Sequence, residues 1–483
     1  MAYGGRREGM GPVFLLVIAA AIPAFGLGYL WRWAETKVPD AKPKEAVIKE
    51  PTLPAALSTP LLSVRRAPQT LATTSSEGAL VSALQTMTPL IGDASCLEVR
   101  LGEQTIYTKG DTTPVTPASN EKLITAAVAL EVLGADYTFT TKALGTVADG
   151  VVTGDLYLLG GGDPLLSTAA YPPTVAPDPP TDVTALEVIV FQMTAAGITH
   201  VNGNVIGDES RYDTERFVPT WSATEIQNKE AGPLGALLVN DATQRLAQNG
   251  NPPKRYADPA VGAATDLIAE LKKVGITVGG RAASGLTPAG TPEITSVTSV
   301  PLSTIVGEML RTSDDNTAEM LMKEMGYHVN GAPGTRQGGI DAIKGTLVTW
   351  DIDTTPLNVI DGSGLDSGNV VTCDLLLQVL EHSPLDGPVG AGLPIAGQAG
   401  TTLETLFAGS SVAGRLHAKT GTLANVKALT GFVTTSAGPI VFAMLLAGPD
   451  IDAPANYQPV WDQLAAVLGP YPSGPSVDAL QPR

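Results

Sequence analysis

The sequence is poor in the residues that form most metal sites and disulfide frameworks. Its 483 residues include only two cysteines and four histidines, and no two histidines have the H-E-x-x-H spacing of a metal site. Two cysteines cannot form a disulfide framework. One bridge between Cys96 and Cys373 is possible, but we expect two buried thiols.

Basic residues are also scarce. The chain has 30 lysines and arginines against 48 aspartates and glutamates, a net charge of −18. Binding to nucleic-acid phosphates requires a basic surface, so nucleic acid is excluded as a partner. Charged residues make up only 16% of the chain, whereas glycine (52) and proline (38) are abundant. We therefore expect many turns and short strands.

An apolar run lies near the N-terminus. No charged residue occurs between Glu8 and Arg32, and a run of this length can cross a bilayer, which needs about 20 apolar residues. A cleaved signal peptide is the alternative, but the run is long for one and no clear cleavage site follows it. We predict an uncleaved, single-pass anchor over residues 1–33. More basic residues follow the run than precede it, so the distribution of positive charge points the wrong way for export, although long domains translocate largely regardless of such charges.

The remainder of the chain divides into regions that differ in proline content and in the secondary structure their patterns predict. Residues 34–76 contain six prolines and are predicted to form a semi-rigid linker, with folded structure starting at 77. Residues 138–295 contain patterns typical of β-hairpins and two patterns of a helix followed by a strand. From residue 296 the patterns again predict helices. Strands joined by tight turns near the C-terminus predict an antiparallel sheet with helices from both chain ends packed on it, an α/β (α+β) fold. Residues 471–483 are a tail.

Three short motifs carry candidate chemistry. A serine–lysine acyl-transfer site needs a nucleophile, a neutral base, a proton relay, and an oxyanion hole beside a cationic anchor. Each motif alone has an ordinary explanation as a helix cap, a first-turn side chain or a strand end. A Ser-x-x-Lys match occurs by chance about once in a chain this long. Their order and their helix or strand settings favour function. The motifs are Ser119-Asn-Glu-Lys122, Ser313-Asp-Asp-Asn316 and Lys419-Thr-Gly421.

The spacing of these residues suits the chemistry. Residues three apart on a helix are neighbours, so Lys122 can reach the Ser119 hydroxyl. Lys122 can be a base only if its pKa is lowered, which burial and a nearby Lys419 would both do. Gly421 would let a substrate backbone lie against the strand. The competing hydrolase pattern is missing, because there is no G-x-S-x-G and no partner histidine; His417 is expected to be a packing residue.

The three motifs together resemble those of penicillin-binding proteins and serine β-lactamases. From about residue 78 to 468 the chain resembles more specifically the serine D-alanyl-D-alanine carboxypeptidase/endopeptidase family, the low-molecular-mass class C penicillin-binding proteins. Class A β-lactamases place the first two serines close together, whereas this family accommodates a long gap as inserted domains. The segments that carry the resemblance are PASNEKLITAAVALEVLG, GDLYLLGGGDPLL, VNGNVIGDES, AGPLGALLVND, DGSGLDSGN and HAKTGTLANVKALTGFV.

The resemblance implies a role for each motif residue. Ser119 would be the acylated nucleophile, Lys122 its base and Ser313 the proton relay. The terminal carboxylate of the substrate would be held by Lys419 with Thr420 and Thr422. The backbone N–H groups of Ser119 and Thr422 would form the oxyanion hole.

One position departs from the family pattern. Asp315 stands where the family has an asparagine, and a carboxylate cannot supply the N–H₂ donor that an amide supplies. Either Asp315 lies in the site, which an alignment without a gap favours, or Asn316 takes the role through a shift of the loop. Both are retained as candidates for substrate binding.

The resemblance also implies an architecture and an activity. A penicillin-binding/serine β-lactamase-like domain would comprise residues 77–137 and 296–470, with β-rich domains inserted over 138–295. The expected activity is hydrolysis of peptidoglycan stem peptides at D-Ala-D-Ala, with cross-link cleavage as an open second activity and β-lactams as covalent inhibitors. The enzyme would need no metal or cofactor and would lie outside the cytoplasm, anchored in the cell membrane. A catalytically weak wall-binding scaffold is the alternative, and a β-lactamase is disfavoured by the motif spacing.

Overall fold

The computed structural model describes residue 32 and residues 67–171, 181–228, 231–245 and 254–481. The predicted anchor, apart from Arg32, and the linker up to residue 66 lie outside the described residues. Among the described helices, none is both long and apolar enough to cross a bilayer. Residues 68–481 form one compact unit.

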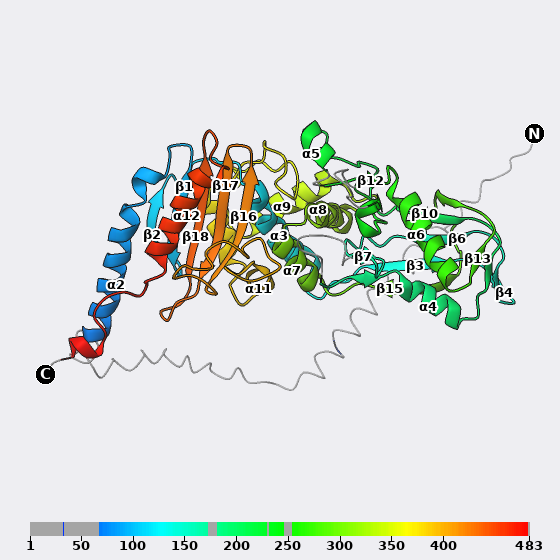
Figure 1. Cartoon of the computed structure of the whole chain (residues 1–483), viewed down its shortest axis with the longest axis horizontal. Helices are drawn as coiled ribbons and strands as arrows, with labels where there is room; N and C mark the ends of the chain where they lie inside the picture. The colour runs from blue at the N-terminus through cyan, green and yellow to red at the C-terminus, as the bar shows by residue number, and fades with distance from the viewer. Residues whose placement is uncertain (1–31, 33–66, 172–180, 229–230, 246–253, 482–483) are drawn as a thin grey trace, which may run out of the picture. The chain divides into compact units, whose positions relative to one another are not determined.

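A five-stranded sheet is antiparallel, as predicted, and its strands come from both ends of the chain (Figure 1). The C-terminal strands pair with the N-terminal hairpin through β18 and β1, so segments far apart in the sequence share one sheet. β16 and β2 are the two edges. In spatial order the strands are β16 (Leu416–Leu423), β17 (Val426–Val433), β18 (Ile440–Ala447), β1 (Cys96–Leu101) and β2 (Gln104–Lys109).

Helices α2 (Ala67–Gln85) and α12 (Pro454–Leu468) pack on one face of this sheet. The helix α2 begins inside the segment predicted to be linker, so that prediction is wrong at its end. The reason is a buried stripe at every fourth residue, Ala72, Ser76, Leu80 and Leu84, which gives the helix an apolar side to bury. Its buried residues Pro68, Ala72 and Ser76 all lie before the predicted start of folded structure at residue 77.

The other face of the sheet is covered by a larger helical core around α3 (Glu121–Leu133). Every residue of α3 from Glu121 to Ala129 is buried, which is typical of a helix enclosed on all sides. The helix that carries the first motif is therefore held in the centre of the domain. The helices around it are α7 (Leu302–Thr312), α8 (Asp315–Asn330), α9 (Arg336–Thr349), α10 (Cys373–Glu381) and α11 (Pro388–Gly392).

A disulfide joins Cys96 of β1 to Cys373 of α10. Both residues are fully buried, as expected, but the prediction of two free thiols is wrong. The two positions are 277 residues apart in the sequence, and only the packing of α10 against the sheet brings them together.

A second sheet and its helices form between α3 and α7. Its strands β6, β10 and β14 are parallel, whereas β3 is antiparallel to both β6 and β15. The helix-then-strand patterns thus give parallel strands flanked by α4 (Glu187–Ala195) and α6 (Pro259–Lys273). β15 runs through the predicted boundary at 295/296. The strands are β3 (Thr140–Leu144), β6 (Leu156–Leu159), β10 (Val205–Asp208), β14 (Ala282–Ser284) and β15 (Glu293–Thr298).

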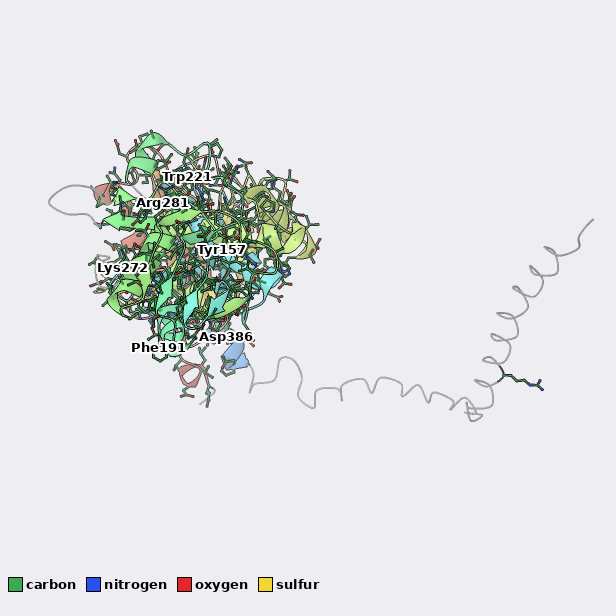
Figure 2. All side chains as sticks on the ribbon, turned by 90° about the vertical axis from the view of Figure 1, so that its right-hand side faces the viewer. Tyr157, Phe191, Trp221, Lys272, Arg281 and Asp386 are labelled. Carbon is green, nitrogen blue, oxygen red and sulfur yellow. A yellow bond between two sulfur atoms is a disulfide. The ribbon has the colours of Figure 1, made fainter. Side chains whose placement is uncertain are left out.

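Short elements complete this region. A small sheet joins a hairpin to two parallel strands, and two further strand pairs lie in the connections. Tyr157 of β6, Phe191 of α4 and Lys272 of α6 mark the region in Figure 2. The elements are β4 (Val147–Ala148), β5 (Val151–Val152), β9 (His200–Val201), β13 (Thr277–Val278), β7 (Leu166–Ser167), β8 (Thr184–Ala185), β11 (Thr243–Arg245), β12 (Lys254–Arg255) and α5 (Ala223–Asn228).

Candidate active site

Ser119 lies in a short 3-10 turn, Ala118–Asn120, that leads directly into α3. The flanking residues Pro117, Ala118 and Asn120 are buried, whereas Ser119 is half-buried, so the turn presents the serine outward. Asn120 makes no side-chain capping bond; its Nδ2 donates instead to Thr430 Oγ1 of β17 at 2.8 Å. The turn is thereby attached to the sheet, and the helix N-terminus stabilises negative charge beside Ser119.

The Lys122 side chain is fully buried beneath Ser119. Its Nζ lies 3.2 Å from Ser119 Oγ, 2.5 Å from Asp315 Oδ1 and 2.7 Å from the Ser363 carbonyl oxygen. An ammonium has three N–H donors, and these three acceptors use all of them. The amine is therefore fixed in place within reach of the serine hydroxyl.

The other two motifs meet on the opposite side of the site. Lys419 Nζ donates to Ser313 Oγ at 2.8 Å and to the Thr420 carbonyl oxygen at 2.8 Å. Ser313 ends α7 in the left-handed conformation, with φ 62°, which turns its side chain toward the strand. Burial, followed by the positive charge of Lys122, holds the pKa of Lys419 well below its usual range. The three motifs thus converge in one place.

The structure places Asp315, and not Asn316, at the site. Asp315 begins α8 and faces Lys122, whereas Asp314 caps the helix by accepting from the Asn316 backbone N–H at 2.9 Å. The Asn316 amide is buried on the other side, where it accepts from the Gly232 backbone N–H at 2.7 Å and donates to Asp241 Oδ1 at 3.0 Å. The motif therefore serves both as a helix cap, through Asp314, and as part of the site, through Asp315.

The Lys-Thr-Gly motif lies on the edge strand β16. Backbone groups of Leu416 and Ala418 pair outward with residues 394–396. Because backbone groups alternate in direction along a strand, those of Thr420 and Thr422 face the same edge. No strand among the described residues pairs with β16 there. An extended peptide can add to such an edge by main-chain hydrogen bonds.

Gly421 packs against the turn that carries Ser119. A Cβ at this position would lie 2.8 Å from the Pro117 carbonyl oxygen and 3.2 Å from Ala118 Cβ. The glycine therefore allows the turn that carries Ser119 to pack directly on β16, and its missing side chain makes room for the backbone of the residues that precede the nucleophile.

We expect Gly421→Ala to lower the rate of acylation by penicillin about tenfold or more, because small displacements of a reacting group are costly. The turn must shift to accommodate the methyl group, and Ser119 shifts with it. Gly345→Ala is the matched control, since Gly345 is an exposed residue of α9 with no atom within 4 Å of an added Cβ. Equal acylation rates for both variants would contradict this account of Gly421.

A loop of residues 361–369 supports the site and was not assigned a role from the sequence. Besides the Ser363 carbonyl on Lys122, its Gly362 carbonyl accepts from Thr125 Oγ1 at 2.7 Å. Glu319 of α8 accepts from the backbone N–H groups of Gly362 and Ser363 at 3.0 and 2.8 Å, and burial, followed by the charge of Asp361, raises the pKa of Glu319 to about 8. The sequence signal that could have identified this loop is the concentration of aspartate, glycine and serine in DGSGLDSGN.

The same loop is tied to the inserted region by Asp361. Its carboxylate accepts from the Trp221 indole N–H at 2.7 Å and from Asn369 Nδ2 at 2.6 Å; Trp221 is labelled in Figure 2. Glu121, next to Lys122 in the sequence, is fully buried, and burial raises the pKa of its carboxyl well above the usual range. Two acidic groups behind the nucleophile are thus buried, and Asp361 is also held in place by hydrogen bonds.

Asp315→Asn is expected to move the basic limb of the acylation–pH profile to lower pH. The Asp315 charge raises the pKa of Lys419, so its removal lowers that pKa further and Lys419 loses its proton at a lower pH. Rates of penicillin acylation measured across the pH range test this.

Asn316→Ala provides the contrast. It should leave the profile in place but lower the free energy of unfolding by about 1–3 kcal/mol, because its buried partners lose their bonds. The reverse pattern, with the profile moved by Asn316→Ala alone, would place Asn316 in the site.

Within the described part of the chain, no group of three or more His, Cys, Asp or Glu side chains could hold a metal ion. His417 is half-buried on β16, and burial lowers its pKa. The groups that touch Ser119 and its neighbours are lysines, a carboxylate, a hydroxyl and main-chain atoms, which are the parts of a serine acyl-transfer site of the penicillin-binding type.

Comparison with known proteins identifies the family. Residues 89–253 and 246–468 match the D-Ala-D-Ala carboxypeptidase 3 (S13) family, and the chain belongs to it. It is 30% identical over 452 residues to a D-alanyl-D-alanine carboxypeptidase of Actinomadura sp. (strain R39), covering 78% of this chain and 80% of the relative. A carboxypeptidase of Mycobacterium tuberculosis is 29% identical over 367 residues, 72% of this chain and 75% of that protein. The protein is thus a serine-type D-Ala-D-Ala carboxypeptidase, a hydrolase.

Solved structures show the same fold. Penicillin-binding protein 4 of Haemophilus influenzae matches with a TM-score of 0.66 at 20% identity, covering 80% of this chain and 99% of that chain. The same protein complexed with a β-lactam matches with a TM-score of 0.57 at 21% identity, covering 79% of this chain and 99% of that chain. The predicted fold, a penicillin-binding domain with additional β-containing regions, is confirmed.

Proposed function

We propose that this protein removes the terminal D-alanine from peptidoglycan stem peptides through an acyl-enzyme at Ser119, and that β-lactams acylate the same serine. The observation that carries the proposal is the position of Lys122 Nζ, which contacts both Ser119 Oγ and Asp315 beside an open strand edge. The names of the relatives and the β-lactam complex of a protein of the same fold support the same substrate class.

In the acylation step, Ser119 Oγ attacks the carbonyl carbon of the penultimate D-alanine and its proton passes to Lys122. Lys122 acts as the base in its neutral form, and the contact with Asp315 stabilises the ammonium that forms when Lys122 takes the proton. The N–H groups of Ser119 and Thr422 stabilise the oxyanion.

Breakdown of the intermediate requires a proton on the departing amine. Ser313, which accepts a hydrogen bond from Lys419, is the hydroxyl placed to deliver it. The C–N bond then breaks, the terminal D-alanine leaves and an ester remains on Ser119. The proton that Lys122 took from Ser119 replaces the one that Ser313 gave to the amine, so Lys122 is again a neutral amine. Water then attacks the ester and gives its proton to Lys122, which passes it to Ser119 Oγ as the C–O bond breaks. The shortened stem peptide leaves with a free carboxylate.

Release of D-alanine from a pentapeptide ending in D-Ala-D-Ala tests this function directly, together with covalent labelling by a fluorescent penicillin. We expect both. Labelling without release of D-alanine would leave an acylated but hydrolytically weak protein, as in the scaffold alternative. Absence of both would reject the proposed function. Cleavage of a cross-linked dimer of stem peptides, measured in the same assay, would add endopeptidase activity.

We further propose that the protein is anchored in the cell membrane with its catalytic domain outside the cytoplasm. The apolar run before Arg32 supports an anchor. The Cys96–Cys373 disulfide supports an extracytoplasmic domain, because disulfides persist mainly in oxidising compartments. The protein should sediment with membranes, and protease added to intact spheroplasts should degrade it. Complete protection from that protease would contradict the orientation.

A further inference from the structure

Lys427 lies one strand in from the open edge of the site and is the charged residue of the largely apolar strand β17. It pairs in register with Thr422 of β16, so both side chains point to the same face of the sheet. Its Nζ donates a hydrogen bond to Thr422 Oγ1 at 2.8 Å. None of the steps above uses this lysine.

The surroundings of Lys427 do not explain why a lysine occupies this position. The residue is only 9% exposed, and its ammonium lies 4.2 Å from the centre of the Tyr457 ring and 5.3 Å from that of Trp461, both on α12. In the part of the chain that the structure describes, no carboxylate forms a salt bridge with it, and Asp452 is the acidic group whose charge reaches it. A charge withdrawn from water without an ionic partner is unfavourable, although the aromatic rings offset part of the cost.

The bond to Lys427 determines what the Thr422 hydroxyl can do. A hydroxyl has one hydrogen and two lone pairs. The ammonium occupies a lone pair, so the hydrogen of Thr422 points away from Lys427. Because the Thr422 side chain is exposed at the open end of the strand, this hydrogen is available to an incoming ligand. The Thr422 hydroxyl can therefore donate to a hydrogen-bond acceptor on the ligand, and the positive charge of Lys427 favours an anionic acceptor.

The balance of charge in the site favours the same kind of ligand. The positive charges of Lys122 and Lys427 both lower the pKa of Lys419, after the larger effect of its burial, so the three lysines lie within electrostatic reach of one another. Asp315 forms a salt bridge with Lys122. A substrate carboxylate at Thr422 would be attracted by Lys427, with which no carboxylate of the described residues forms a salt bridge.

We propose that Lys427 is a positioning residue that selects substrates whose leaving amino acid has a free carboxylate, by fixing Thr422 as a hydrogen-bond donor. The proposal rests on the proposed function, because it concerns the same substrate. It adds a cation behind Thr422 to the recognition of the carboxylate.

Two peptides with the same acyl part test the proposal, one ending in D-Ala-D-Ala with a free carboxylate and the other with that carboxylate converted to an amide. We expect Lys427→Met to lower kcat/KM for the acid about tenfold, the usual scale for one charge-assisted contact, and to change the amide little. Deacylation of the common acyl-enzyme should be unchanged, since the leaving residue has already departed. Lys427→Arg should retain most of the preference for the acid.

Two further variants separate this role from a structural one. Lys109→Met is the matched control, because Lys109 lies on β2 at the opposite edge of the same sheet. In a Thr422→Val background, Lys427→Met should have little further effect on the acid substrate, since the lysine acts through that hydroxyl.

An equal loss on the acid and amide peptides, or slower deacylation, would show a general structural role and overturn the proposal, as would an unchanged preference for the acid. If the unmodified protein hydrolyses neither peptide and is not labelled by penicillin, the proposed function itself fails, which is a distinct result.

Discussion

Ser119→Ala is expected to abolish acylation by penicillin, with a loss of at least about 10⁴-fold, the scale seen when a serine nucleophile is removed. Ser119 is the hydroxyl within reach of Lys122 Nζ, and alanine leaves no oxygen there to form the ester. Mass spectrometry of the unmodified protein after reaction with penicillin should place the adduct on the peptide that contains Ser119.

The loss in this variant should be chemical and not structural. Ser119 is half-buried and its side-chain bond is the one to Lys122, so the melting temperature should change little. An adduct on a different peptide, or a labelled Ser119→Ala protein, would reject Ser119 as the nucleophile. Rapid turnover of the drug by the unmodified protein would instead favour the β-lactamase alternative.

Lys122→Met should lower the acylation rate about 10³-fold, within the range that general acid–base catalysis contributes. Methionine has a similar length but cannot accept the proton of Ser119. The variant also leaves Asp315 without its ionic partner, and breaking a buried pair from one side costs about 3–5 kcal/mol of stability. A single substitution therefore combines a chemical and a structural effect.

The double variant Lys122→Met/Asp315→Asn separates the two effects. It removes both charges, so we expect most of the stability to return while acylation stays low. Thermal melting and penicillin acylation rates, measured on the same preparations, give the comparison. Recovery of acylation together with stability would show that Lys122 serves only to hold the site in shape.

The local part of the site could be predicted from the sequence. The contact between Ser119 and Lys122 follows from their spacing at a helix start, and such short-range geometry depends on few other residues. The antiparallel sheet was likewise predictable, because strands near the C-terminus are joined by tight turns and their hydrophobic residues are continuous. The helix-then-strand patterns predicted α4 and α6 with the strands that follow them.

Several residues could not be assigned from their neighbours in the chain. Whether Asp315 or Asn316 faces the site depends on Gly232 and Asp241, which occupy the Asn316 amide from a distant segment. The reason for Gly421 is the close packing of Pro117. Lys427 and the loop at 361–369 acquire a purpose only when β17 and α8 lie beside the nucleophile.

By itself the sequence determined the class of chemistry, the fold class and the residues of the three motifs. These follow from short sequence patterns in which the residues that matter are close together in the chain. Only the tertiary structure decided which residue of the second motif faces Lys122, that Cys96 and Cys373 are bonded, and that a buried lysine stands behind Thr422. The first two depend on side chains that are far apart in the chain and meet where the two halves of the domain pack around α3. The third depends on α12, whose aromatic rings cover Lys427.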